Sequence, residues 1–186
     1  MSISGSALLV IDVQNGFDDP YWGPRNNPDC EGNIARLVAA WQRRGNPVVY
    51  VHHDSQTPGS PLSAGTDGNA YKPALPPGPD LQIAKTVHSA FYGTPDLRQW
   101  LTDRGLGAVT VTGITTDHCC ETTARMASDI GFDTYFVLDA THTFDRTHPD
   151  GRTVAADDIA AATAASLHGE FATVLGTQNA LALLDR

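Results

Sequence analysis

The segment Val111-Thr-Gly-Ile-Thr-Thr-Asp-His-Cys-Cys120 is the part of this chain that most constrains its fold. The apolar run at 108–112 predicts a buried strand that ends at Gly113. Threonine and aspartate residues, which favour helix starts, come next, and a helix is predicted from about 118 to 130. We therefore expect Cys119 in the first turn of a helix, just past the carboxyl end of a strand.

That position favours chemistry at Cys119. Unpaired backbone amides and the positive end of the helix dipole both stabilise a thiolate relative to a thiol, and they can also bind an anion formed in a reaction. A free cysteine is more often a small buried hydrophobic residue, and Cys120 suits that role because its side chain points about 100° away around the helix. The pattern predicts that Cys119 is a nucleophile and that Cys120 packs against the sheet.

Two other segments carry reactive side chains at predicted strand ends. Asp12 follows the apolar run at 7–11, and Lys85 follows the short strand predicted at 81–84. The carboxyl ends of parallel strands share one edge of a sheet, where open α/β folds have their sites. The sequence therefore predicts that Asp12, Lys85 and Cys119 lie together at this edge.

Strand and helix patterns alternate along the chain, which is typical of a parallel sheet covered on both faces. We predict one domain, 1–186, with the fold of a three-layer α/β/α sandwich around a mainly parallel, Rossmann-like sheet of about six strands. Strands are predicted at 7–12, 48–51, 81–84, 108–112, 134–138 and 172–175, and helices at 29–44, 95–103, 118–130 and 155–167.

Charge and cysteine usage narrow the class of protein. A net charge of −9 without a Lys/Arg cluster is opposite to what a nucleic-acid partner requires. The first apolar stretch, 7–11, is too short for a signal peptide or a membrane span, and three cysteines do not suggest a disulfide framework. We expect a soluble cytoplasmic protein that binds neither nucleic acid nor membrane.

The motifs resemble those of the isochorismatase-like cysteine hydrolases, which include nicotinamidases, N-carbamoylsarcosine amidohydrolase and streptothricin hydrolase. The resemblance extends from about Ala7 to about Gly176. It is carried by Asp12, by Lys85 before Ser89-Ala-Phe91, and by Gly113-Ile-Thr-Thr-Asp-His-Cys119.

The resemblance implies that the protein cleaves a carbon–nitrogen amide-type bond of a small molecule through a thioester, without a cofactor. It implies that Asp12 is the general base, that Lys85 keeps Asp12 ionised and lowers the thiol pKa, and that Cys119 is the nucleophile. It also implies a cis peptide bond between Ile114 and Thr115, with the Thr115 and Cys119 amides forming an oxyanion hole.

Substrate-binding and metal-binding residues follow less directly from the sequence. Phe17, Trp22, Tyr92 and His118 are candidates for the pocket wall. Nicotinamidases bind a metal through an Asp-x-His pair and a second histidine downstream. Here the segment reads His52-His-Asp54, and the downstream loop contains no histidine. A closed metal site needs three or four ligands, so we expect no metal.

Two other functions remain open. One is vinyl-ether hydrolysis of the isochorismatase type, which depends on the aspartate and needs no thiol. The other is a non-catalytic, redox-responsive binding protein that uses the adjacent pair Cys119 and Cys120. We also expect a dimer or tetramer in which the long loop 52–79, through Pro61-Leu62 and Ala74-Leu-Pro-Pro77, contacts a neighbouring subunit.

Overall fold

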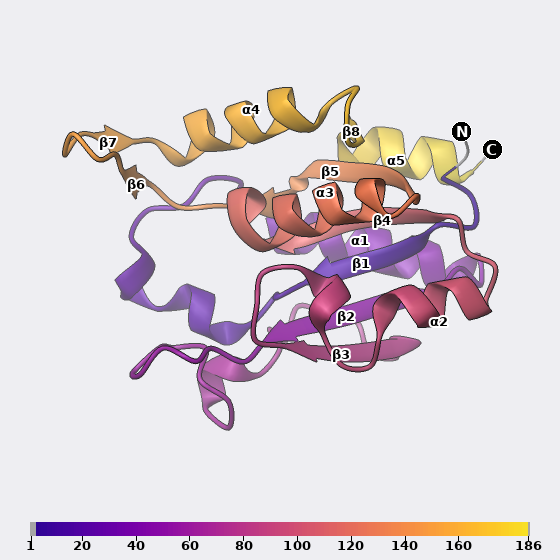
Figure 1. The fold of residues 1–186 in the computed structure, drawn as a ribbon, viewed down its shortest axis with the longest axis horizontal. Coiled ribbons are helices and arrows are strands. Elements are labelled where there is room, and N and C mark those ends of the chain that lie inside the picture. Colours follow the sequence, from indigo (N-terminus) through magenta and orange to yellow (C-terminus); the bar gives the residue numbers. More distant parts are fainter. Residues whose placement is uncertain (1–2, 186) are drawn as a thin grey trace.

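The computed structural model describes residues 3–185, and at its centre is a six-stranded sheet of order β3-β2-β1-β4-β5-β8 (Figure 1). All neighbouring strands of this sheet pair in parallel. Its strands are β1 (Ala7–Ile11), β2 (Val48–His53), β3 (Leu81–Lys85), β4 (Ala108–Ile114), β5 (Asp133–His142) and β8 (Thr173–Leu175). A separate antiparallel hairpin consists of β6 (Arg146–Thr147) and β7 (Thr153–Val154).

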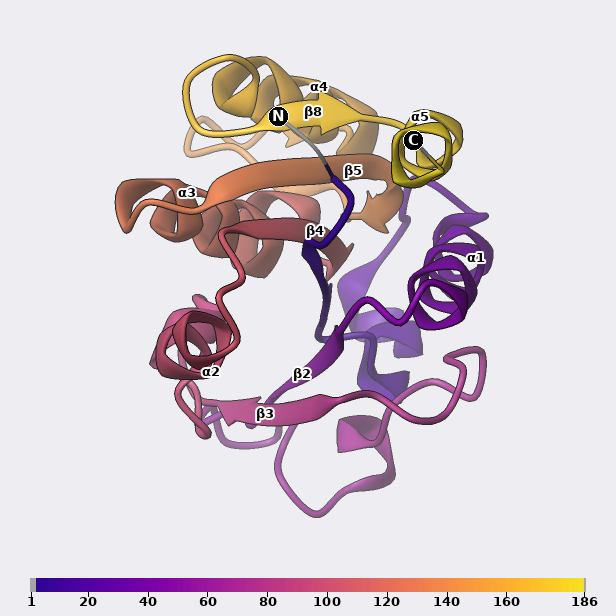
Figure 2. The same cartoon turned by 90° about the vertical axis from the view of Figure 1, so that its right-hand side faces the viewer.

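Helices cover both faces of the sheet, as Figure 2 shows in a view turned by 90°. One face carries α1 (Cys30–Arg43) and α5 (Thr177–Leu184), and the other carries α2 (Leu97–Asp103), α3 (Glu121–Asp129) and α4 (Ala156–Leu167). The prediction of a three-layer α/β/α sandwich with a parallel sheet of about six strands is confirmed. No helix in the described part of the chain is long and apolar enough to span a membrane.

Strand β1 lies in the middle of the sheet, and all five of its side chains are buried. Leu8 and Val10 pack into the core under α1, whereas Leu9 and Ile11 pack into the core on the opposite face. Because side chains alternate along a strand, an uninterrupted apolar run is what two covered faces require. Each such side chain contributes roughly 1.5–3 kcal/mol on burial, so β1 anchors both cores.

The chain changes face between the two central strands. The connection after β1 runs through α1 on one face of the sheet, and the connection after β4 runs through α3 on the other. Such a switch point leaves a crevice at the carboxyl ends of the two strands. The residues that follow β1 and β4, Asp12 and the segment that carries Cys119, therefore border this crevice.

The start of the helix after β4 differs from the prediction. A π-helical turn, Thr116–Cys120, precedes α3, and the Thr115 carbonyl accepts hydrogen bonds from the amides of His118 and Cys120. The wide turn has no signature in the sequence, because its residues are those of an ordinary helix start. Cys119 therefore lies in a π-turn before the helix and not in the first turn of the α-helix itself.

Strand β5 is also longer than predicted, and a bulge is the reason. Its register with β4 passes from Val111↔Phe136 to Gly113↔Thr141, so β5 contains extra residues opposite β4. The Asn27 side-chain amide donates to the carbonyls of Leu138 and Thr141, which holds the two sides of the bulge together. The hairpin β6–β7 and the last helix, α5, were not predicted either.

Side-chain hydrogen bonds order the long loop after β2. The Asn69 amide donates to the carbonyls of His53 and Leu62 and to the Asp54 carboxylate. Leu62 is only 4% exposed and packs into the chain's own core. The Leu62 side chain is therefore not available for the predicted subunit contact, and the contact of this loop with a neighbouring subunit stays a prediction.

Candidate active site

Asp12 lines the crevice and has a left-handed backbone conformation, with a φ of +50°. Aspartate is one of the few residues that tolerate this conformation. Its amide donates to the Val51 carbonyl at 2.8 Å, which continues the ladder to β2 for one more residue. Its carboxyl group is fully buried, and Oδ1 has no hydrogen-bond partner among the described residues.

Lys85 is the last residue of β3, and its ammonium group places a positive charge beside Asp12 in the crevice. Its Nζ lies 2.6 Å from Asp12 Oδ2, 3.4 Å from Cys119 Sγ and 3.4 Å from His53 Nδ1. Burial lowers the pKa of Lys85, but the nearby Asp12 carboxylate and Cys119 outweigh burial, and the net pKa is raised. The ammonium is therefore charged in the folded protein, and it contacts both the carboxylate and the sulfur.

Cys119 is 8% exposed, and its sulfur lies at the base of the crevice. Burial raises the pKa of the Cys119 thiol, the negative charge of Asp12 raises it further, and Lys85 only partly opposes them. The expectation that this position favours the thiolate before substrate binds is therefore wrong. Desolvation of the thiolate outweighs the opposing effect of Lys85, so the net pKa shift favours the neutral thiol.

The backbone between β4 and the π-turn places Thr115 in the lining of the same crevice as Asp12 and Cys119. The bond between Ile114 and Thr115 is cis, as the resemblance implied. Gly113 has a φ of +123°, and a β-carbon on it would lie 2.0 Å from the Ile11 carbonyl oxygen, so only glycine fits against β1 here. Thr115 is 4% exposed, and its hydroxyl, like Asp12 Oδ1, has no hydrogen-bond partner among residues 3–185.

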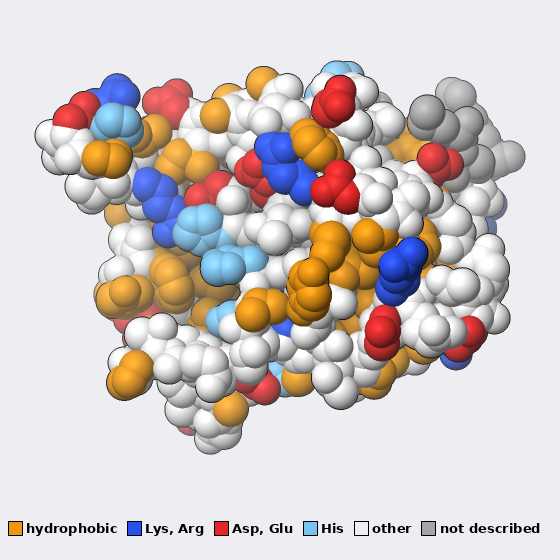
Figure 3. Space-filling view, in the orientation of Figure 1, with side chains coloured by type: hydrophobic (Ala, Val, Ile, Leu, Met, Phe, Trp, Pro, Cys, Tyr) orange, Lys and Arg blue, Asp and Glu red, His pale blue; other side chains and the backbone are white. Residues whose placement is uncertain are grey.

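A cavity of about 90 Å³, which we call the inner cavity, opens onto the sulfur. Its lining residues come from the ends of β1, β2, β3 and β4 and the segments that follow them: Asp12, Phe17, Trp22, His53, Leu62, His88, Thr115, His118 and Cys119. Figure 3 shows histidine side chains gathered beside the N-terminal end of α3, next to hydrophobic side chains. The crevice thus has a polar base and an apolar and histidine-rich wall.

Of the four predicted pocket residues, three line the inner cavity. The Trp22 indole donates to the Gly16 carbonyl at 2.8 Å, and its ring lies 5.0 Å from that of Phe17, so two contacts hold the indole in this wall. The His118 ring lies 5.8 Å from that of His88. Tyr92 does not line the cavity: it is 69% exposed, because the turn after Lys85 directs it to the surface.

Sequence reasoning missed two lining residues, His53 and Leu62. His53 ends β2 directly opposite Lys85 in the β2–β3 register, so the pairing of the two strands was the signal that could have identified it. His88, whose place three residues after Lys85 predicts that it lies beside the pocket, does line the cavity. Leu62 lies in a loop without periodicity, and nothing in the sequence indicates that it folds back over the crevice.

The segment His52-His-Asp54 has other contacts. His52 Nδ1 lies 3.2 Å from the Tyr71 hydroxyl, and its Nε2 lies 3.4 Å from the Asp54 carboxylate. His53 faces Lys85 instead, because successive side chains of a strand point to opposite faces. Within residues 3–185 no group of three His, Cys, Asp or Glu side chains converges as metal ligands do.

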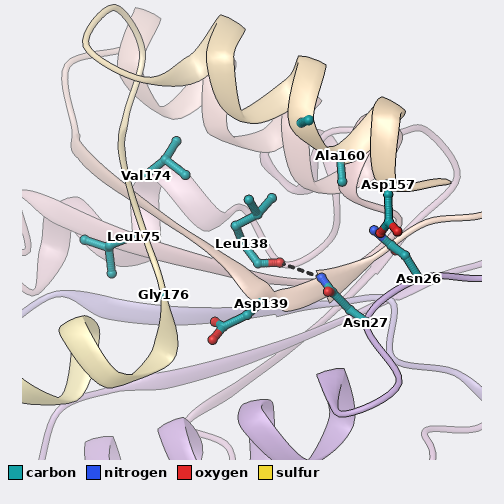
Figure 4. Close-up of a pocket in the computed structure, with 10 residues that line it drawn as sticks. Asn26, Asn27, Leu138, Asp139, Asp157, Ala160, Val174, Leu175 and Gly176 are labelled. Carbon is teal, nitrogen blue, oxygen red and sulfur yellow. Dashed lines mark hydrogen bonds between the residues drawn. The ribbon is translucent and has the colours of Figure 1, made fainter. Parts of the chain in front are cut away.

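A larger cavity of about 340 Å³ lies away from the crevice, between α4, β5 and β8 (Figure 4). Two of its polar side chains make structural hydrogen bonds: Asn27 donates to the Leu138 carbonyl, and Asp139 accepts from Thr177. It contains no cysteine, lysine or histidine. The predicted reactive side chains Asp12 and Cys119 line the smaller cavity instead.

The fold and the site define the class: an α/β/α sandwich protein that presents a buried cysteine, with a carboxylate and an ammonium, at the switch point of its parallel sheet. The chain belongs to the isochorismatase family of hydrolases, since the isochorismatase domain model matches residues 6–171.

Individual relatives agree with this assignment. The uncharacterised isochorismatase family protein YrdC of Bacillus subtilis (strain 168) is 40% identical over 172 residues, 92% of this chain and 91% of the relative. Nicotinamidase 3 of Arabidopsis thaliana is 33% identical over 153 residues, 75% of this chain and 74% of the relative. The crystal structure of an isochorismatase-family protein from Chromobacterium violaceum ATCC 12472 is 40% identical, with a TM-score of 0.92 over 99% of this chain and 95% of that one.

Proposed function

We propose that this protein is a cysteine-dependent hydrolase that cleaves a carbon–nitrogen amide-type bond of a small molecule through a thioester. One observation carries the proposal: the Lys85 ammonium donates to both the Asp12 carboxylate and the Cys119 sulfur inside a buried crevice. Acyl transfer to a thiol needs a nucleophile and a general base held close together, and one cation here contacts both. The similarity to nicotinamidase 3 of A. thaliana supports amide chemistry.

In the first half-reaction Asp12 accepts the thiol proton, and the Cys119 sulfur forms a bond to the substrate carbonyl carbon. The carbonyl oxygen becomes an oxyanion, which the Thr115 and Cys119 amides stabilise. The tetrahedral intermediate collapses when Asp12 donates its proton to the nitrogen. The C–N bond then breaks, the amine leaves, and the acyl group remains on sulfur as a thioester.

In the second half-reaction Asp12 is again a carboxylate and deprotonates a water molecule. The hydroxide adds to the thioester carbonyl carbon, and the carbon–sulfur bond breaks. The proton on Asp12 then returns to the sulfur, and the carboxylic acid product leaves. Over the cycle one water is consumed, and the three side chains return to their starting protonation states.

The raised pKa of the Cys119 thiol is compatible with this mechanism. Before proton transfer the cluster contains a carboxylate, an ammonium and a neutral thiol, and afterwards it contains a carboxylic acid, an ammonium and a thiolate. The net charge of the buried cluster is zero in both states, so the transfer adds no unbalanced charge to a low-dielectric site. Lys85 stabilises whichever partner carries the negative charge.

The experiment that tests the proposal compares two neighbouring cysteines. We expect Cys119→Ala to abolish release of ammonia or acid from small primary amides, N-carbamoyl compounds and lactams. We expect Cys120→Ala to remain active and to lose about 1 kcal/mol of stability, because Cys120 is fully buried in the apolar core. Mass spectrometry of the acid-quenched wild type should detect the acyl group on Cys119.

Full activity of Cys119→Ala would contradict the proposal and would favour vinyl-ether hydrolysis, which needs Asp12 but no thiol. Loss of catalysis in Cys120→Ala at an unchanged melting temperature would assign the chemistry to the other cysteine.

A further inference from the structure

The inner cavity continues into a second cavity of about 220 Å³, which we call the outer cavity. The two share Trp22, His53 and Leu62 in their linings, so a bound molecule can extend from one into the other. The other lining residues of the outer cavity come from two loops and carry no charge: Tyr21, Ser55, Thr57, Pro58, Gly59, Ser60 and Pro61.

We infer that the substrate is an uncharged amide with a short flexible link, whose amide group occupies the inner cavity and whose neutral, partly apolar body occupies the outer cavity. This inference rests on the proposed function, because it takes Cys119 as the point where the amide carbonyl binds. It assigns specificity to Trp22, Leu62 and the loop of Thr57.

Charge is the first argument. No lysine or arginine lines either cavity. The cations nearest this edge are each paired with a carboxylate: Lys85 with Asp12, Arg146 with Asp117, and Lys72 with Asp18 and Glu31. Burial lowers the pKa values of His53 and His118, which therefore stay neutral near pH 7. A carboxylate on the substrate would therefore have to compete with a carboxylate of the protein for each of these cations.

The unpaired polar atoms at the base of the inner cavity are the second argument. Asp12 Oδ1 can only accept a hydrogen bond while Asp12 is ionised, and the Thr115 hydroxyl can donate or accept. An amide offers both an N–H for Asp12 and a carbonyl oxygen for a donor. A carboxylate offers only acceptors, and its charge opposes that of Asp12.

Size is the third argument. A cavity of about 150 Å³ binds benzene, so an inner cavity of about 90 Å³ is too small for an amide joined directly to an aromatic ring. The outer cavity, at about 220 Å³, has room for such a ring. The amide must therefore be separated from any ring by a flexible link that passes between Trp22 and Leu62.

Equilibrium binding to Cys119→Ala tests the inference without depending on turnover. The probes are 4-phenylbutyramide, benzamide and succinamate, measured by titration calorimetry. We expect 4-phenylbutyramide to bind at least about tenfold more tightly than benzamide, whose ring is attached directly, and than succinamate, which carries a carboxylate. Equal or tighter binding of either of the other two, or no saturable binding of 4-phenylbutyramide, overturns the inference.

A matched pair of variants tests the charge argument, each made in the Cys119→Ala background. Thr57 is exposed and lines the outer cavity, whereas its exposed neighbour Gln56 does not. We expect Thr57→Arg to tighten succinamate binding by about tenfold and Gln56→Arg to leave it unchanged. An equal response of both variants, or none, contradicts the assignment of the outer cavity as the subsite.

Failure of the proposed function has a different signature. If Cys119→Ala binds 4-phenylbutyramide selectively but Cys119 forms no thioester in the wild type, the thiol mechanism is wrong and the neutral-ligand site stands. If the thioester forms but succinamate is bound and hydrolysed as well as the neutral amide, the mechanism stands and the inference fails.

Discussion

At the scale of single residues, Lys85 determines how the site is arranged. An ammonium has three hydrogens, and three acceptors lie around Nζ: Asp12 Oδ2, Cys119 Sγ and His53 Nδ1. Because each hydrogen has one acceptor, the Lys85 ammonium is held in an orientation that keeps one hydrogen directed at the Cys119 sulfur. His53 is therefore a positioning residue for Lys85.

We predict that His53→Phe lowers kcat by about tenfold, the equivalent of one hydrogen bond of about 1.4 kcal/mol, because Lys85 loses its third acceptor. His53→Asn should retain most of the rate, since the asparagine oxygen lies close to the position of Nδ1. The measurement is kcat together with the pH profile of Cys119 alkylation, and His52→Asn is the control. Equal rates in His53→Phe and His53→Asn would contradict the role.

Asp12 allows a prediction in which two readouts move in opposite directions. Its negative charge raises the pKa of the Cys119 thiol, so Asp12→Asn should lower that pKa and speed alkylation by iodoacetamide at pH 7. Amide turnover should fall severely, because asparagine cannot accept the thiol proton. Alkylation that slows in parallel with turnover would indicate a damaged site and not the loss of a base.

In the wild type the same raised thiol pKa sets the direction of pH dependence. Alkylation of Cys119 should increase continuously as the pH rises from 7 to 10, because the thiolate fraction is still small at neutral pH. A plateau already reached below pH 8 would mean that the thiolate is present before substrate binds.

At the scale of elements, the contact between β1 and β4 depends on Gly113. A β-carbon at this position would lie 2.0 Å from the Ile11 carbonyl oxygen, and the φ of +123° is itself unfavourable for any other residue. We predict that Gly113→Ala lowers the free energy of unfolding by roughly 3–5 kcal/mol, measured in urea. Gly107→Ala, just before the same strand, is the control, because nothing lies within 4 Å of the added carbon. Similar losses in both variants would show that the strand contact is not responsible.

The end of β5 contains a titratable group that burial keeps neutral. His142 is fully buried, and burial lowers its pKa from 6.5 to about 3. Below pH 6.5 the unfolded chain takes up a proton that the folded chain does not, so the contribution of His142 to stability is complete above pH 6.5 and is lost as the pH falls towards 3.

We therefore predict that the free energy of unfolding falls by roughly 4 kcal/mol across this range on account of His142. His142→Gln should flatten that part of the curve, whereas His148→Gln, in the loop between β6 and β7, should not. A steep acid limb that persists in His142→Gln would assign the proton uptake to another group.

At the scale of the whole molecule, we predict a dimer or tetramer in which a neighbouring subunit helps to enclose the crevice. Three large apolar side chains are exposed in the loops after β1 and β3, at the edge of the sheet that bears the site: Tyr21, Val87 and Tyr92. Covering them would also exclude water from the reaction.

Light scattering at micromolar concentration should give a mass at least about twice the single-chain 19.8 kDa. We expect Tyr92→Glu to shift the protein towards the monomer, and Arg36→Glu, on the exposed side of α1, to leave the mass unchanged. A fully active wild-type monomer would exclude the predicted assembly.

The sequence by itself determined the α/β alternation, the parallel sheet and the positions of Asp12, Lys85 and Cys119 at strand ends. These features depend on local patterns, namely apolar runs and the residues that end them, and parallel strands bring their carboxyl ends to one edge whatever the loops do. The family motif added the cis bond between Ile114 and Thr115.

Only the tertiary structure decided the environment of those side chains. The raised pKa of the Cys119 thiol reflects the total desolvation of the crevice, and the position of His53 beside Lys85 depends on the pairing of β2 with β3. The π-turn, the β5 bulge, the burial of Leu62 and the exposure of Tyr92 depend on which distant segments meet. Dielectric environment and packing are sums over neighbours from the whole chain, and a local sequence pattern contains only a few of those neighbours.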